Sequence, residues 1–255
     1  MADQRSTTLP AVVHVPGWFQ GPTGMGQGGW TAHRFARLVD GPVSIGLTAP
    51  VPLDVDLHVV HQPLPHEPGA ERWTLVHHTD DGPVTVMTAT PRDSGFPDTE
   101  AVDVDRARAA SARFDALVDV HPVPYCFSCG LQHDSMGVHA GPLPDGRFAT
   151  DWRVPEWAIT SDGVVDEGVM WAAIDCCAAW YVGYSRAPRR AVTAQLAVEV
   201  SAPLRPDTTY ALVAWSGGQA TTGWDGRKRH AASAAFDPDG ACVARSVSFW
   251  IALDA

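Results

Sequence analysis

The stretch that decides the fold is GVMWAAIDCCAAWYVGY, residues 168–184, which is apolar on nearly every side when it is wound as a helix. Such a helix must be enclosed by the rest of the chain, because a surface helix is apolar on one face only. Asp175 is the only charged residue within it. Buried aspartates are rare without a partner or a task, and burial raises their pKa toward the range of a usable base. We therefore predict an enclosed helix with Asp175 as a functional carboxylate. The alternative is a structural aspartate bonded to a hydroxyl or a backbone amide.

A second stretch, QGGWTAHRFA at residues 27–36, aligns with the start of the first. Matching Gly29 to Gly168 pairs Ala36 with Asp175 at an offset of 139 residues. Further landmarks follow in the same order, at offsets that grow to 153 and then 158: residues 48–50 match 201–203, 53–54 match 206–207, and 79–82 match 237–240. The chain is therefore interpreted as a duplicated unit in which only the second helix carries a carboxylate.

Runs that alternate or are β-branched, separated by turn sequences, predict four antiparallel strands after each helix. They cover residues 44–48, 55–59, 73–77 and 84–88, and then 192–202, 208–215, 228–236 and 242–251. Residues 16–29 are expected to form a loop, 103–117 a linking helix, and 137–139 and 148–152 weak strands. We predict an α+β protein with an N-terminal unit over residues 1–90, a connector over 91–124 and a C-terminal unit over 125–255.

The composition excludes several classes of function. The chain has 255 residues, of which 45% are hydrophobic, and a net charge of -11, which argues against a nucleic-acid or anionic-membrane binder. An apolar signal core and a run long enough to span a bilayer are both missing from the sequence, so we expect a cytoplasmic protein. Five cysteines do not form a disulfide framework. The adjacent Cys176 and Cys177 are expected to be core residues.

One sequence motif is a candidate metal site. Cys126 and Cys129 are followed by His133 and His139. The gap between the second cysteine and the first histidine is far shorter than a zinc finger requires, and no second cysteine pair follows at a suitable spacing. We therefore expect no metal ion.

Helix geometry indicates where Asp175 acts. It lies nine residues beyond Asp166, about 13 Å along a helix, so it cannot easily serve the N-terminus of its own helix. If the two units pack face to face, it reaches the first turn of the other helix. Free backbone amides there favour a developing oxyanion, and Gly28 and Gly29 allow a ligand to approach them closely. In the opposite pairing the start of the second helix, at Gly168, would meet Ala36 of the first helix instead of a carboxylate. One competent site is therefore predicted.

These motifs resemble the hotdog-fold acyl-CoA thioesterases, specifically the double-hotdog type. A common branch of that superfamily carries His-Gly-Gly at the helix start and Asp or Glu at a similar spacing beyond it. The segment from Asp166 to Asp175 fits this spacing, and CFSCG at 126–130 followed by MGV at 136–138 looks like the lead-in to a first strand. The resemblance implies two fused hotdog units, each an antiparallel sheet wrapped around a central helix. Asp166 and Glu167 depart from the pattern, which leaves the first helix as the better oxyanion site.

The activity that the resemblance implies is hydrolysis of an acyl thioester, carried by coenzyme A or by an acyl-carrier protein. Asp175 would act as base or nucleophile, amides at the start of the first helix would hold the oxyanion, and side chains on the strand after the second helix would orient water. The expected catalytic residues are Asp175, Gly28, Gly29, Gln27, Thr193 and Gln195.

Three further expectations concern ligands and partners. Arg227, Lys228 and Arg229 are candidates for binding a phosphate of coenzyme A, with a solvated loop as the alternative. No cofactor is expected beyond the coenzyme A of the substrate, and two chains are candidates to form a homodimer. His33 is a possible acid or base, although packing or capping is favoured.

Two other functions remain open. One is a hydratase, dehydratase or cyclase acting on a thioester-bound intermediate, although the Asp-to-His spacing of the common hydratases is missing around Asp175. The other is a non-catalytic acyl-binding protein.

Overall fold

The computed structural model describes residues 11–63, 71–93, 95–114, 121–132, 134–184, 190–217 and 224–253. In the first half the elements are β1 (Val12–His14), α1 (Gly28–Ala36), β2 (Val43–Leu47), β3 (Asp56–Pro63), β4 (Glu71–Thr79) and β5 (Gly82–Pro91). They are followed by α2 (Val104–Ser111), β6 (Gly141–Pro142), β7 (Phe148–Arg153), α3 (Gly168–Tyr184), β8 (Ala191–Val200), β9 (Thr209–Trp215), β10 (Lys228–Phe236) and β11 (Cys242–Ala252). Short 3-10 turns at Gly17–Phe19 and Glu156–Ala158 follow β1 and β7.

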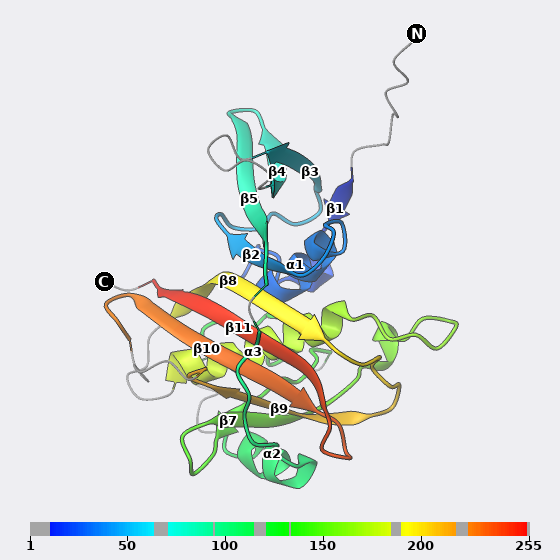
Figure 1. Ribbon diagram of the computed structural model, residues 1–255, viewed down its shortest axis with the longest axis vertical. Coiled ribbons are helices and arrows are strands. Elements are labelled where there is room, and N and C mark those ends of the chain that lie inside the picture. Colours follow the sequence, from blue (N-terminus) through cyan, green and yellow to red (C-terminus); the bar gives the residue numbers. More distant parts are fainter. Residues whose placement is uncertain are drawn as a thin grey trace.

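Within the described residues the strands form one 11-stranded sheet with antiparallel neighbours, in the order β1-β3-β4-β5-β2-β8-β11-β10-β9-β7-β6. Across the sheet, the first half runs β1-β3-β4-β5-β2 and the second half runs β7-β9-β10-β11-β8. In each half the strand before the helix comes first. The second, third and fourth strands after the helix follow it, and the first strand after the helix comes last. The two halves meet edge to edge, where Ile45 of β2 pairs with Leu196 of β8. Figure 1 shows β2 and α1 adjoining the larger second half.

α3 is buried along most of its length, as its all-round apolar sequence predicts. It packs across β7 to β11 on one side and against α1 on the other, while α2 covers the opposite face of β7 and β9 (Figure 1). No helix among the described residues is both long enough and apolar enough to cross a membrane. The sheet and the helix pair thus place the middle of α3 against the start of α1.

Backbone conformations agree with the sequence repeat. Asp54 and Asp207, which align in the repeat, have φ angles of 57° and 55°, a region that few residues other than glycine adopt. Gly24 and Gly163, which are aligned by the offset of the two helices, have φ angles of 76° and 81°. Matching turns at matching positions are expected if both halves follow the same path.

The bounds of α1 and α3, and of the four strands that follow each of them, agree with the sequence prediction to within a few residues. Two parts of it were wrong. Residues 137–139 do not form a strand, because Gly137 turns the chain with a φ of 67° and the amide of Val138 bonds the carbonyl of Ser128. β1 lies in a segment for which we predicted no strand; with three residues it is too short to show a periodic pattern. The linking helix is α2, and residues 115–117 of its predicted range lie outside the described residues.

Candidate active site

Asp175 lies where the middle of α3 meets the first turn of α1. Its Oδ2 accepts hydrogen bonds from the Gly29 amide at 3.2 Å and from Gln27 Nε2 at 2.9 Å. Its Oδ1 accepts one from the Thr193 hydroxyl at 3.0 Å. The residue is 4% exposed. The carboxyl group of one half therefore contacts the helix N-terminus of the other, as helix geometry predicted.

Burial raises the pKa of Asp175 to about 7, because the charged form loses its hydration inside the protein. The hydrogen bond from Thr193 opposes this shift most strongly, and those from Gly29 and Gln27 oppose it less. A carboxyl group with a pKa near neutrality can both accept and return a proton, which is the property that general base catalysis needs.

Gln27 links the start of α1 to this carboxyl group. Its backbone is extended, with φ -70° and ψ 130°, so it is the residue before the helix begins. Its Oε1 accepts a hydrogen bond from the Trp30 amide at 2.7 Å, which caps the first turn. The amide nitrogen of the same side chain is then directed at Asp175. One glutamine thus caps the helix and orients the carboxyl group.

The two glycines of α1 have different roles. A Cβ atom on Gly29 would lie 2.5 Å from the backbone oxygen of Trp171 and 2.9 Å from the Cβ of Asp175, so α1 can approach α3 this closely only with glycine there. A Cβ atom on Gly28 would meet the end of the Leu47 side chain at 2.9 Å and Asp175 Oδ2 at 3.7 Å. Gly29 therefore sets the distance between the helices, and Gly28 borders the carboxyl group.

Gln195, the other residue expected on β8, is not beside Asp175. Thr193 pairs with Trp250 and Gln195 pairs with Phe249, so a bulge in β8 breaks the alternation between them. Thr193 faces Asp175, whereas Gln195 is exposed. The sequence could not reveal this bulge, and the two positions look equivalent in a regular strand.

The basic run is split between surface and core. Arg227 and Lys228 are exposed, but Arg229 is 2% exposed. Its Nη1 donates to the Val182 carbonyl at 2.7 Å, and its guanidinium lies over the Tyr181 ring at 4.7 Å. The expectation that Arg229 binds a phosphate is corrected, because this side chain anchors the C-terminal end of α3 to β10.

The start of α3 is occupied differently from the start of α1. Asp166 Oδ1 accepts the Gly168 amide at 2.9 Å and so caps its own helix. The other oxygen of Asp166 forms an ion pair with Arg34 of α1. The amide that would face a ligand is therefore already bonded, and the carboxylate beside it is already neutralised.

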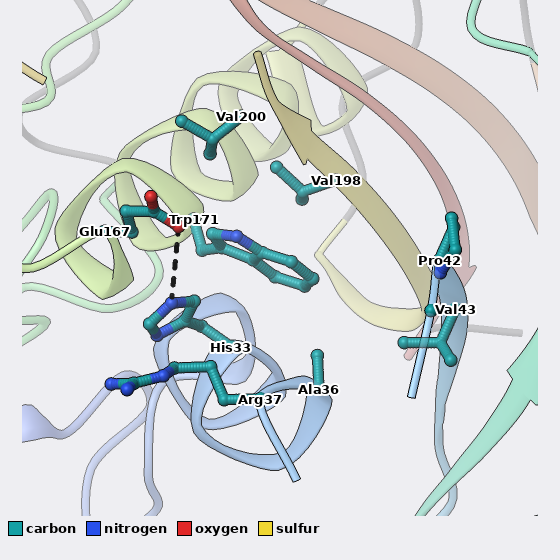
Figure 2. Close-up of a pocket in the computed structure, with 10 residues that line it drawn as sticks. His33, Ala36, Arg37, Pro42, Val43, Glu167, Trp171, Val198 and Val200 are labelled. Atoms are coloured by element: carbon teal, nitrogen blue, oxygen red, sulfur yellow. Dashed lines mark ion pairs between the residues drawn. The ribbon is translucent and has the colours of Figure 1, made fainter. Parts of the chain in front are cut away.

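The reciprocal position is the one where the start of α3 and Ala36 of α1 lie together, and a pocket of about 220 Å³ is found there. Figure 2 shows the side chains that line this pocket. His33 is 3% exposed there, its Nε2 is 3.9 Å from Glu167 Oε2, and burial together with the charge of Arg34 lowers its pKa to about 4. His33 thus belongs to the reciprocal pocket and is a neutral packing residue at neutral pH. The lining residues are His33, Ala36, Arg37, Gly41, Pro42, Val43, Glu167, Trp171, Val198 and Val200.

Two neighbours of the site carried no signal in the sequence. Leu47, at the end of β2, covers Gly28. Cys176, the residue after Asp175, has its sulfur 3.7 Å from Gln27 Nε2. Both were ordinary apolar positions in the sequence, and only the packing of α1 on α3 brings them to the carboxyl group.

Comparisons with known proteins identify the fold. A scan against protein-family models finds no match to the sequence, and neither does a search of the curated proteins. Among solved structures, one from Lactobacillus plantarum with the provisional name oleoyl thioesterase is similar over 96% of both chains, with 8% identity and a TM-score of 0.55. Another from Novosphingobium aromaticivorans, provisionally named a thioesterase, is similar over 94% of both chains, with 12% identity and a TM-score of 0.54.

A third structure, a protein of unknown function with a hot dog fold from Alicyclobacillus acidocaldarius, is similar over 96% of this chain and 93% of that one, with 16% identity and a TM-score of 0.48. The likeness to the first two structures covers nearly the whole chain, and the antiparallel sheet packs around an enclosed helix. The chain has the hotdog fold.

Proposed function

We propose that the chain hydrolyses acyl thioesters and that it consists of two fused hotdog units with one competent site between them. The observation that carries the proposal is the position of Asp175, which belongs to the helix of one half and bonds the first turn of the helix of the other. The shared strand order supports the duplication. We take residues 1–90 as the N-terminal unit, 91–124 as the connector and 125–255 as the C-terminal unit.

In the proposed reaction Asp175 is the general base. It takes a proton from a water molecule, the hydroxyl oxygen bonds to the thioester carbonyl carbon, and the carbon–sulfur bond breaks. The departing thiolate then takes the proton back, which regenerates the carboxylate. A thiol with a pKa of about 8.5 leaves readily, so a strong general acid is not required. Thr193 holds the carboxyl group in place through Oδ1.

Direct attack by Asp175 on the carbonyl carbon is the alternative to base catalysis. It would displace the thiolate and form a mixed anhydride on the side chain, which water would then hydrolyse. A single turnover in oxygen-18 water reveals this route when water attacks the aspartyl carbonyl carbon of the anhydride. Label appears in the peptide that contains Asp175 only if the carboxyl oxygen itself attacks, which mass spectrometry of the digested protein detects.

The first turn of α1 supplies the oxyanion donors in this proposal. N–H groups at a helix start have no acceptor within the helix, and Gly28 and Gly29 occupy the first two positions of α1. In the free protein the Gly29 amide and Gln27 Nε2 bond Asp175. A thioester carbonyl bound beside Gly28 takes over these donors as the carboxyl group turns toward Thr193 and water.

The substrate class is an acyl group on coenzyme A or on an acyl-carrier protein. The similar structures that carry the name thioesterase support this class. Lys228 and Val192 both pair with Ile251 of the strand between them, so Lys228 is about 10 Å across the sheet from the strand that carries Thr193. The proposal therefore assigns the phosphates of a bound coenzyme A or phosphopantetheine to Arg227 and Lys228.

The deciding test is thiol release from a panel of acyl-CoA substrates of different chain length, measured with a thiol-reactive dye. We expect wild-type protein to release thiol and Asp175→Asn to lose this activity while keeping its circular dichroism spectrum and melting temperature. Equal rates for the two proteins would overturn the proposal. Mass analysis of the acyl product separates hydrolysis from the addition or loss of water that a hydratase, dehydratase or cyclase would cause.

One observation favours a second candidate, a non-catalytic acyl-binding protein. Both oxygens of Asp175 are bonded internally and the residue is 4% exposed, as in a structural carboxyl group. This candidate predicts saturable binding of acyl-CoA without thiol release, and equal binding by Asp175→Asn. Association of two chains into a homodimer is a further prediction, which light scattering by the purified protein tests.

A further inference from the structure

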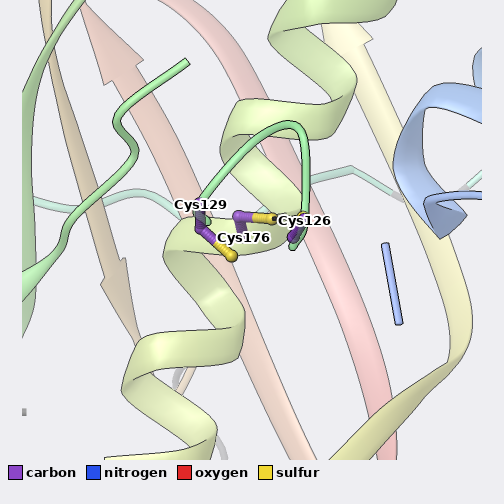
Figure 3. A group of neighbouring side chains, drawn as sticks. All are labelled: Cys126, Cys129 and Cys176. Atoms are coloured by element: carbon purple, nitrogen blue, oxygen red, sulfur yellow. Dashed lines mark hydrogen bonds between the residues drawn. The ribbon is translucent and has the colours of Figure 1, made fainter. Parts of the chain in front are cut away.

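Three cysteine side chains converge behind the candidate site. Cys126 and Cys129 lie on a loop before β6, and Cys176 lies on α3 directly after Asp175 (Figure 3). The three sulfur atoms are within 4.8 Å of one another, and those of Cys126 and Cys176 are 3.9 Å apart. Their exposed fractions are 1%, 2% and 5%, and all three thiols are free. Three soft donor atoms thus surround one point in the core.

The loop holds two of these thiols in place by its own backbone contacts. The Gly130 amide bonds the Cys126 carbonyl at 2.7 Å, and the Leu131 amide bonds the Pro124 carbonyl at 2.9 Å. A Cβ atom on Gly130 would lie 2.3 Å from the Cys126 oxygen, so the tight turn after Cys129 requires glycine. The loop is also bonded to the first half, through the Phe127 amide and the Gln20 carbonyl at 3.0 Å. The thiols are therefore positioned before any ligand binds.

A hydrogen-bond donor lies beside the cysteine group. Gln27 Nε2 is 3.7 Å from the Cys176 sulfur. Donors of this kind stabilise the negative charge of metal-bound thiolates and orient them. Cys177, the next residue of α3, is equally buried but lies outside the group of three, so the convergence is not a general property of cysteines in this core.

We propose that Cys126, Cys129 and Cys176 bind one thiophilic metal ion, zinc(II) or copper(I), through three thiolates. An ion with metal–sulfur bonds of about 2.3 Å to three coplanar sulfurs separates those sulfurs by about 4.0 Å. The Cys126 and Cys176 sulfurs are 3.9 Å apart and none of the three separations exceeds 4.8 Å, so the observed spacing is close to this value. Thiolate ligands select zinc and copper(I) over magnesium, calcium and manganese. On binding, three S–H bonds break, three metal–sulfur bonds form, and three protons pass to solvent, with no change of oxidation state.

The spacing of residues along the chain hid this site. The sequence motif placed Cys126 and Cys129 with His133 and His139. His133 lies outside the described residues, and His139 bonds the Gly130 carbonyl at 3.1 Å and stacks on Phe114. The third ligand comes instead from α3, far along the chain. The described residues supply three ligands. Three thiolates complete the coordination of copper(I), whereas zinc(II) would take a water molecule as its fourth ligand.

The proposed ion would join the loop to α3 beside Asp175 and so stabilise the folded chain. A ligand that binds only the folded state raises its stability. The proposal is independent of thioester hydrolysis, because it concerns metal content and stability and stands whether or not the chain releases thiol.

Metal content of the whole protein is the test. The chain is purified under reducing conditions from cells grown with added zinc, and separately with added copper, and its metals are measured by mass spectrometry. We expect one ion per chain, loss of most of it in Cys126→Ser, and retention in the matched control Cys177→Ser. The arm that fills the site identifies the ion. Wild type without metal in both arms, or equal metal in Cys126→Ser and wild type, would overturn the proposal.

A second measurement needs no variant, in case Cys126→Ser does not fold. Cobalt(II) added to metal-free wild type should produce sulfur-to-cobalt charge-transfer absorption in the near ultraviolet, which an equimolar addition of zinc(II) or copper(I) removes. Removal of the ion should lower the melting temperature. An unchanged spectrum, or a disulfide between Cys126 and Cys176 found in protein purified without reductant but with full metal supply, would contradict a metal site.

Discussion

The starts of α1 and α3 are equivalent positions in the strand order, yet different side chains cap them. At the start of α1 the cap is Gln27, which is neutral, and the acid comes from the other half as Asp175. At the start of α3 the cap is Asp166, which carries its own charge and is paired with Arg34. A neutral cap leaves the helix N-terminus attractive to negative charge, whereas a charged cap satisfies it.

The other end of each pairing shows the same difference. Asp175 fills the space between the helices at one position, while Ala36 borders a pocket of about 220 Å³ at the other. One position thus holds a carboxyl group with three hydrogen-bond donors, and the other has an alanine beside open space.

The largest effect is expected from the carboxyl groups themselves. Asp175→Asn keeps the shape of the side chain but cannot take a proton, so kcat/KM for thioester hydrolysis should fall about 10²–10⁴-fold, the range that a general base supplies. Asp166→Asn is the matched control, because asparagine caps helices as well as aspartate does. It should leave kcat/KM near the wild-type value. Similar losses in the two variants would mean that the two helix starts do not differ in function.

The glycines give the next largest effect. Gly29→Ala places a methyl group against the backbone of Trp171, which cannot move aside, whereas Gly168→Ala meets only side-chain atoms at 3.1–3.2 Å. We expect Gly29→Ala to lose about 1–3 kcal/mol of stability through overpacking and about 100-fold in kcat/KM through displacement of Asp175. Gly168→Ala should change both far less. Urea unfolding and the thiol-release assay measure the pair, and equal behaviour would contradict the close approach at Gly29.

His33 gives the reciprocal pocket a pH dependence. Its pKa is about 4 in the folded protein and 6.5 in an unfolded chain, so the unfolded chain binds the proton more tightly. The free energy of unfolding is therefore highest above pH 6.5, where His33 is neutral in both states. It falls as the pH drops from 6.5 toward 4, because the unfolded chain takes up the proton first. Between pH 7 and pH 5 the free energy of unfolding should drop by about 2 kcal/mol more in wild type than in His33→Gln.

Urea titrations at each pH measure this difference. Parallel pH profiles for wild type and His33→Gln would show that His33 takes up a proton in the folded protein as readily as in the unfolded chain.

A smaller effect is expected from the hydroxyl group that holds Asp175. Thr193→Val keeps the size of the side chain and removes the hydrogen bond to Oδ1, so kcat should fall about 10-fold with little change in KM. Gln195→Ala, two residues along the same strand and exposed, should leave both constants unchanged. If Gln195→Ala is the more damaging of the two, the bulge in β8 does not select Thr193 as proposed.

Much of this arrangement could be predicted from the sequence. The apolar run after Gly168 predicted an enclosed helix, and the length of that helix directed Asp175 to the other half. The turn residues predicted two of the hairpins, because Gly82 and Gly240 adopt positive φ angles of 116° and 82° between paired strands. These features depend on local periodicity and on the rise of a helix, which the order of residues determines.

The rest depended on packing. Arg229 looked like part of a basic surface run, but its guanidinium is held by the end of α3, which no local pattern reveals. Thr193 and Gln195 looked equivalent until a bulge separated them. The third thiol of the cysteine group comes from Cys176, and only the docking of the loop on α3 brings it to Cys126.

The smallest expected effect is the most direct test of the contrast between the helix starts. Ala36→Asp, introduced into Asp175→Asn, restores a carboxyl group at the reciprocal position. We expect no recovery of thiol release, because the Gly168 amide already donates to Asp166 and Arg34 already pairs with it, so the new carboxyl group finds no free donor to orient it. The measurement is the rate of thiol release by the double variant beside Asp175→Asn alone. Recovery would show that a carboxylate on the helix is enough by itself, and that the neutral cap at Gln27 is not what makes the start of α1 competent.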